Sequence, residues 1–117
     1  MKKFILIAML VLLPTQAQAK VAFIDGNNLV KQMRENDNSV VRSPNTDYSE
    51  VRAFQGFTAG VFDTLSALDM ICPSTSITGG QVSAIVTKYL KDNPEKWNEA
   101  AINLVHSALM NAFPCKK

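Results

Sequence analysis

Cys72 and Cys115 are the only cysteines in this 117-residue chain, and two helical patterns lie between them. Apolar side chains recur at spacings of three and four from Val82 to Leu90, and again from Trp97 to Ala112. This spacing is typical of helices with one apolar face. A proline follows the first cysteine and another precedes the second, so both cysteines fall at the ends of elements. The sequence therefore predicts two helices held between the cysteines.

Local signals set the ends of these two helices. The Thr78 hydroxyl and the Gln81 side chain have the spacing of a capping box, which predicts a helix that starts after Thr78 and ends near Asp92. Proline disfavours the helical conformation at Asn93 and itself suits a first helical position. We therefore expect a tight connection at Asn93 and a single fourth helix from Pro94 to Pro114.

The N-terminal half predicts a short helix and then a loop. Asp25 can cap a helix whose apolar positions are Leu29, Val30 and Met33. This helix is expected to end by Asn36. Residues 36–46 are mostly polar, and the sequence predicts an exposed loop there, with Val40 and Val41 directed inward.

The longest predicted helix starts at Asp47 and keeps helical period to Leu68. Glu50 lies at the capping-box spacing from Asp47. Gly56 and Gly60 each cost about 1 kcal/mol of helix propensity, so we expect the bare face beside Phe57 to be used for dimer or helix packing. Taken together, the patterns predict one all-α bundle of about four main helices with one disulfide.

The N-terminus has the order of a secretory signal peptide. Two lysines are followed by an apolar run from Phe4 to Leu13 and by the A-x-A site Ala17–Ala19. An uncleaved anchor is the alternative, but the apolar run is short for a membrane span. We predict a signal peptide at residues 1–19 and a single domain at residues 20–117, which is 98 of the 117 residues.

Charge and cysteine content narrow the function. The two leader lysines account for the whole net charge of +2, so the mature chain carries ten basic and ten acidic residues. That balance disfavours binding to nucleic acid or to anionic lipid. We also expect no stable membrane insertion after cleavage of the leader. Two cysteines in an exported chain are expected to pair. Closing a loop of about 44 residues is worth roughly 4 kcal/mol on the chain-entropy account.

The sequence predicts no catalytic residue, no metal site and no cofactor. A Cys–His enzyme would need a free thiolate beside His106, the only histidine, and the expected disulfide removes that thiolate. A lone histidine on a helix flank is more often a surface residue than a ligand. No cluster of histidine, cysteine and carboxylate has ligand spacing.

A set of short motifs runs along most of the mature chain. Its residues are Gly26, Asn27, Leu29, Val30, Gly56, Phe57, Gly60, Asp63, Cys72, Pro73, Ile77, Thr78, Gly80, Gln81, Tyr89, Leu90, Pro94, Glu95, Ala100, Ala101, Ala108, Leu109, Ala112, Phe113, Pro114 and Cys115. This set of motifs resembles the Rap/Tai immunity-protein family. The resemblance is strongest between the two cysteines, where spacing and residue type both agree.

The resemblance implies a small periplasmic helical homodimer that neutralises a peptidoglycan amidase delivered by type VI secretion. It implies an inhibitor and not an enzyme. The family commonly has a further cysteine pair, whose positions correspond here to Met33 and Phe54. Since both side chains are apolar, we expect the first two helices to meet there through a sulfur–aromatic contact.

The predicted effector-binding loop runs from Pro73 to Thr78. Its residues Ser74, Thr75 and Ser76 are small and polar, Ile77 precedes the cap, and the disulfide holds its base. Such groups enter a cleft at low cost in desolvation and side-chain entropy. The polar stretch from Ser39 to Asp47 is the rival surface, and a plain connector is the alternative.

Two other functions stay open on sequence grounds. One is a small periplasmic acid-stress chaperone of the one-disulfide helical type, although the modest and balanced charge disfavours it. The other is a secreted protein-interaction module. A neighbouring gene for a secreted amidase would favour immunity, and neighbouring acid-resistance genes would favour the chaperone.

Overall fold

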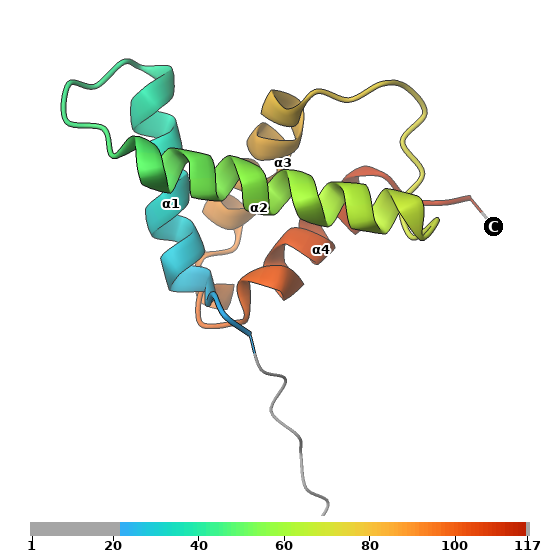
Figure 1. Ribbon diagram of the computed structural model, residues 1–117. Helices are drawn as coiled ribbons and strands as arrows, with labels where there is room; N and C mark the ends of the chain where they lie inside the picture. The colour runs from blue at the N-terminus through green and yellow to red at the C-terminus, as the bar shows by residue number, and fades with distance from the viewer. Residues whose placement is uncertain (1–21, 117) are drawn as a thin grey trace, which may run out of the picture.

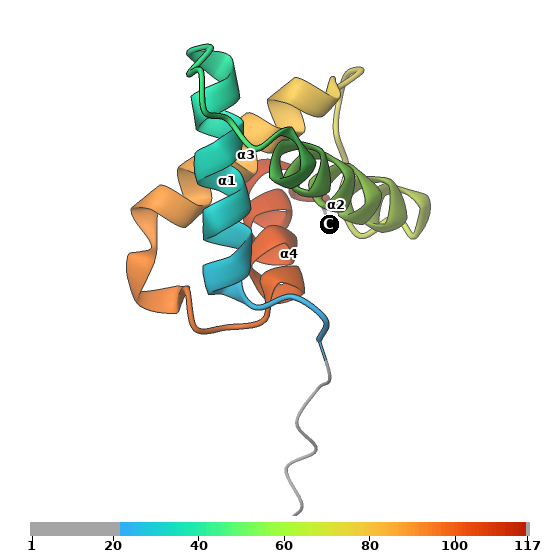
Figure 2. The ribbon, with the colours of Figure 1, turned by 60° about the vertical axis from the view of Figure 1, so that its left-hand side comes forward.

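Helix α2 (Tyr48–Ala67) is the longest element and contacts the other three helices (Figures 1 and 2). The computed structural model describes residues 22–116. Around α2 lie α1 (Gly26–Val40), α3 (Gly79–Asp92) and α4 (Ala101–Ala112), and a 3₁₀ turn, η1 (Pro94–Lys96), precedes α4. The predicted all-α bundle of four main helices is confirmed. The predicted leader and its cleavage site lie outside the described residues.

Apolar faces of all four helices meet in one core. Its largest fully buried side chain is Phe54, and Met33 lies in the same cluster. α1 packs against α2, so the first two helices do meet, while the sulfur–aromatic contact itself stays a prediction. The buried members are Leu29, Val30, Met33, Phe54, Val61, Leu65, Ile71, Val82, Val86, Leu90, Ala101, Leu104, Val105, Ala108 and Leu109. Within residues 22–116, no helix is long and apolar enough to cross a membrane.

The three predicted N-caps are present, and one differs in detail. Asp25 accepts a hydrogen bond from the Asn28 amide, and Thr78 and Gln81 form the complete capping box. Asp47 accepts from the amides of Ser49 and Glu50. However, Glu50 does not bond back to the Asp47 amide; Glu35 of α1 takes that role, with 2.8 Å between its Oε2 and the Asp47 nitrogen. The capping box of α2 is therefore completed by Glu35 of α1.

The prediction that the first helix ends by Asn36 is wrong. α1 continues to Val40 because its polar residues find partners: Asn36 is buried and its Oδ1 accepts from Gln55 Nε2 at 3.0 Å. Arg42 then ends the helix in the left-handed region with φ 55°. Val40 and Val41 do not turn inward; they are 74% and 75% exposed.

The predicted single helix from Pro94 to Pro114 is also wrong, because the chain breaks between η1 and α4. The Ile24 carbonyl accepts from the Ala101 amide, and the Gly26 amide donates to the Glu99 carbonyl, so the lead-in segment pairs with the chain before α4. Trp97 packs on the α3 end instead of lying on α4, and its indole N–H donates to the Leu90 carbonyl at 2.8 Å. A Cβ on Gly26 would lie 2.4 Å from the Trp97 carbonyl oxygen, which explains the glycine there.

Gly56 and Gly60 do not serve packing between helices of the same chain. A Cβ built at either position meets no atom within 4 Å among the described residues. Both lie on the exposed side of α2. The expectation of a close helix neighbour is therefore wrong within one chain, and a dimer contact on this face stays a prediction.

Candidate functional site

The connection between α2 and α3 is tied to the C-terminal segment by a covalent bond. Cys72 and Cys115 form the predicted disulfide, with Cα atoms 4.9 Å apart. Next to it, the Cys72 amide donates to the Phe113 carbonyl at 2.9 Å. Phe113 in turn packs edge-on against Phe62 of α2, with ring centroids 5.7 Å apart. The base of this connection is therefore fixed to two parts of the bundle.

We call residues Pro73–Thr78 the disulfide loop. Pro73 and Ile77 are half-buried, and Ile77 packs against the core. Between these anchors, Ser74, Thr75 and Ser76 are exposed. The capping box at Thr78 fixes the far end, so the exposed triplet is short and held on both sides.

Two exposed apolar side chains precede the disulfide loop. Leu68 is 64% exposed and Met70 is 41% exposed. They flank Asp69, which ends α2 with φ 53°. This end of the molecule thus presents apolar side chains and small polar groups near one another along the chain.

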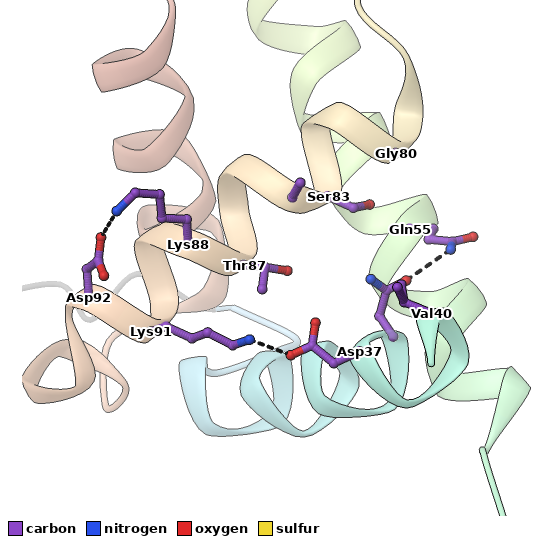
Figure 3. Close-up of a pocket in the computed structure, with 11 residues that line it drawn as sticks. Asp37, Val40, Gln55, Gly80, Ser83, Thr87, Lys88, Lys91 and Asp92 are labelled. Atoms are coloured by element: carbon purple, nitrogen blue, oxygen red, sulfur yellow. Dashed lines mark hydrogen bonds and ion pairs between the residues drawn. The ribbon is translucent and has the colours of Figure 1, made fainter. Parts of the chain in front are cut away.

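A groove lies on another side of the bundle, between α1, α2 and α3 (Figure 3). Its volume is about 490 Å³. Figure 3 shows the ion pair from Asp37 to Lys91, at 2.7 Å, which links α1 to α3. Lys88 and Asp92 form a second pair along α3. The lining residues are Asn36, Asp37, Val40, Gln55, Gly80, Ser83, Ala84, Thr87, Lys88, Lys91 and Asp92.

The floor of this three-helix groove carries hydroxyl groups. The Thr87 Oγ1 is buried with no hydrogen-bond partner in the part of the chain that the structure describes. Ser83 Oγ of α3 and Thr58 Oγ1 of α2 lie 3.5 Å apart between the two helices. Since both lysines are paired with carboxylates, the groove has no excess of either charge. It lies beside Val40 and so adjoins the predicted rival surface.

A smaller hollow lies where the lead-in segment meets α2 and α4. Its volume is about 400 Å³, and its lining residues within 22–116 all have apolar side chains: Ala22, Phe23, Ile24, Phe57 and Ile102. Phe57 is half-buried, and Phe23 and Ile102 are exposed. We call this site the apolar hollow.

The resolved pKa shifts among the described residues lie outside the disulfide loop. The hydrogen bond and charge of Glu50 raise the pKa of Lys31 above its usual value. Hydrogen bonds from Ser49 and then from the Glu50 amide lower the pKa of Asp47. A hydrogen bond to Tyr89 raises the pKa of Lys96. Each shift is the consequence of a structural contact: Lys31 with Glu50, Asp47 at the cap of α2, and Lys96 with Tyr89.

Metal chemistry finds no support in residues 22–116. No group of three or more histidine, cysteine, aspartate or glutamate side chains could hold an ion there. His106 is half-exposed on α4. Both cysteines are in the disulfide, so neither thiol is free for a Cys–His mechanism.

The model of the Rap1a immunity proteins matches residues 25–115. The chain belongs to this family. The match begins at the cap of α1 and ends at the second cysteine, so it covers all four helices and the disulfide loop. No curated protein matches the chain. Membership gives the coarse function as immunity, with a secreted effector protein as the implied partner.

Sequence reasoning identified the disulfide loop but missed the three-helix groove and the apolar hollow. The groove depends on Gln55 meeting Asn36, 19 positions away, and on Lys91 meeting Asp37. The apolar hollow depends on Phe57 and Ile102 coming together. Helical periodicity assigns each of these side chains to one face of its own helix. It does not predict which faces of different helices come into contact.

Proposed function

We propose that the protein acts in the periplasm as the immunity protein of a peptidoglycan amidase delivered by type VI secretion. Family membership over residues 25–115 carries this proposal. The leader-like N-terminus and the disulfide agree with an oxidising compartment outside the cytoplasm. The protein would bind its partner and perform no reaction of its own.

We infer that the disulfide loop occludes the amidase cleft. The bond at Cys72 and the cap at Thr78 hold both of its ends, so little loop entropy is lost on binding. Ser74, Thr75 and Ser76 are small enough to enter a cleft, and their hydroxyls can pair with polar groups there. Removing water from them costs less than burying charged side chains would.

Leu68 and Met70 supply the apolar contacts beside this polar triplet. Protein interfaces commonly combine buried apolar anchors with a polar rim. At the disulfide-loop end the two kinds of group lie within a few residues of each other. The apolar pair would press against the surface beside the cleft while the triplet enters it.

The decisive experiment replaces Ser74, Thr75 and Ser76 with arginine or glutamate. Effector binding measured by calorimetry is expected to weaken at least roughly 30-fold, the scale of a lost hot spot. Far-ultraviolet circular dichroism and the melting temperature should stay unchanged, because the triplet is exposed. Inhibition of cell-wall hydrolysis should be lost in parallel.

A matched control makes the same replacements at Ser43, Pro44 and Asn45 in the rival loop. These variants should bind the effector as the unmodified protein does. If instead they lose binding while the disulfide-loop variants keep it, the contact lies on the α1–α2 side beside the three-helix groove. Unchanged inhibition by the disulfide-loop variants removes that loop from the mechanism.

The protein is further proposed to be a homodimer that uses the bare side of α2. Gly56 and Gly60 leave space there, and Phe57 lies beside them on the flank. Glycines let a second backbone approach closely. Light scattering of the mature protein at micromolar concentration should report twice the monomer mass, and a monomer would contradict the proposal.

A further inference from the structure

Phe23 has no partner among the residues that the structure describes. Its relative exposure is 104%, as high as in an extended peptide. A lone exposed aliphatic side chain is ordinary, whereas a fully exposed aromatic beside an apolar cavity forms a feature that a partner can use. Phe23 is also one of the residues that line the apolar hollow.

The backbone that carries Phe23 is held in place. Next to it, the Ile24 carbonyl accepts from the Ala101 amide at 3.0 Å, and Asp25 is paired with Ala100 in an isolated bridge. The Gly26 amide donates to the Glu99 carbonyl at 2.7 Å. The segment that carries Phe23 is therefore docked on the chain before α4. Figures 1 and 2 show the lead-in to α1 passing close to the start of α4.

The hollow beside it can receive an aromatic ring. Its volume is about 400 Å³, and a protein cavity of about 150 Å³ is enough for benzene. The lining residues among those that the structure describes are all apolar, so no charged side chain among them opposes an apolar occupant. Along α2, Gly60 follows Phe57 by three residues and therefore lies on the neighbouring flank, where no atom lies within 4 Å of an added Cβ.

We propose that the apolar hollow of one copy receives Phe23 of a second copy. The inference rests on the proposed homodimer and names its contact. A protruding ring and a cavity of suitable size occur on the same patch, and a two-fold contact brings identical patches together. Each copy then supplies one ring and one hollow, so both exposed phenylalanines are buried in a single symmetric exchange. Gly56 and Gly60 allow the two α2 helices to come close at its edge.

The first test compares oligomeric states by sedimentation equilibrium. Phe23→Ala should raise the dimer dissociation constant at least roughly tenfold, the effect expected of an interface anchor. Leu68→Ala is the matched control, because it also removes an exposed apolar side chain, but at the far end of α2. The control should dimerise as the unmodified protein does. Equal dimerisation of the Phe23→Ala variant would overturn the proposal.

The second test asks where the ring lies. Phe23→Cys and Ile102→Cys variants are purified separately with the Cys72–Cys115 bond confirmed by peptide mapping, then mixed and treated with a short thiol-reactive cross-linker. The exchange predicts a covalent dimer that joins position 23 of one copy to position 102 of the other. Absence of this product while the unmodified protein is dimeric would place the dimer contact elsewhere.

If the apolar hollow holds the chain's own Phe23 or the effector instead, the experiments give different results. A Phe23→Cys, Ile102→Cys double variant that cross-links only within one chain would show that Phe23 covers its own hollow. Phe23→Ala that weakens effector binding without changing the oligomeric state would assign the hollow to the effector. Either result overturns the exchange. Effector inhibition by the monomeric Phe23→Ala variant would leave the immunity function intact, so failure of the two proposals can be told apart.

Discussion

The connections before and after α2 begin in the same way and are anchored differently. Each connection starts where a helix finishes in a Schellman-type motif with a residue other than glycine in the left-handed region, Arg42 after α1 and Asp69 after α2. Hydrogen bonds close both motifs, from Ser43 to Asn38 and from Met70 to Leu65. The local backbone geometry is thus shared, and the difference lies in what holds the loop that follows.

Non-covalent contacts anchor the α1–α2 connection. The Lys31–Glu50 pair, at 2.7 Å, and the Glu35 contact to the Asp47 amide join the two helices near the loop. The α2–α3 connection is longer and has the disulfide instead. A short connection between adjoining helices can be fixed by caps and surface pairs, whereas a longer exposed one loses more entropy and gains more from a covalent tie.

Removal of the disulfide is expected to have the largest effect on stability. The Cys72→Ala, Cys115→Ala double variant should lose about 4 kcal/mol of unfolding free energy, because its unfolded chain is no longer closed into a loop. Urea unfolding measures the loss. Hydrogen exchange should rise first in the disulfide loop and much less at residues 43–47. An equal rise in hydrogen exchange in both connections would show that the disulfide does not anchor the α2–α3 connection selectively.

A new disulfide between α1 and α2 tests the same difference between the two connections of α2. The Met33→Cys, Phe54→Cys double variant is expected to form a second bridge, since both positions lie in the core between α1 and α2. Reduced, it should be less stable by about 3–5 kcal/mol because the Phe54 ring leaves a cavity. Oxidation should restore roughly 3 kcal/mol by closing a loop of about 20 residues. A thiol assay that finds no bridge would show that the two side chains do not adjoin.

The cap of α2 gives a smaller, pH-dependent effect. Hydrogen bonds to Ser49 and Glu50 lower the pKa of Asp47 in the folded protein below 3.8. The unfolded state therefore binds the proton more readily, so this stabilisation is present above pH 3.8 and is lost as the pH falls below it. Asp47→Ala should lower the melting temperature at pH 7 by a few degrees.

Asp47→Asn is the matched control for the charge. Asparagine caps a helix nearly as well as aspartate but does not ionise in this range. The variant should keep most of the stability at pH 7, and its stability should fall less than that of the unmodified protein as the pH drops below 3.8. If both variants retain the full acid dependence, other carboxylates account for it.

The sequence predicted the elements more reliably than their ends. Caps at Asp25, Asp47 and Thr78 depend on neighbouring residues, so they could be predicted from spacing alone. The end of α1 and the start of α4 could not. Asn36 stays helical because of Gln55, and α4 starts late because Ile24 pairs with Ala101.

The candidate site likewise has one part that could be predicted from the sequence and another that could not. The disulfide and the loop that it holds follow from two cysteines and a capping box that are visible in the sequence. The exposure of Val40 and Val41 and the apolar hollow depend on how distant segments are placed. Val41 follows directly after α1, and no local pattern distinguishes an exposed valine from one that turns inward.

The smallest expected effect concerns the two left-handed residues. A non-glycine residue in this region costs about 1–2 kcal/mol, and aspartate tolerates it better than a long side chain does. Arg42→Gly should therefore stabilise the protein by about 0.5–1 kcal/mol, and Asp69→Gly by about half as much, after the extra freedom of glycine in the unfolded chain is subtracted. Urea midpoints of the two variants, measured side by side, give the difference. The disulfide restrains the chain at Cys72, close to Asp69 and far along the chain from Arg42. In the Cys72→Ala, Cys115→Ala background, Arg42→Gly should therefore keep its gain in unfolding free energy. The gain of Asp69→Gly should change in that background if the disulfide and the left-handed turn at Asp69 restrain the same segment. Identical gains in both backgrounds would show that the disulfide constrains the loop beyond the turn and leaves the end of α2 independent of it.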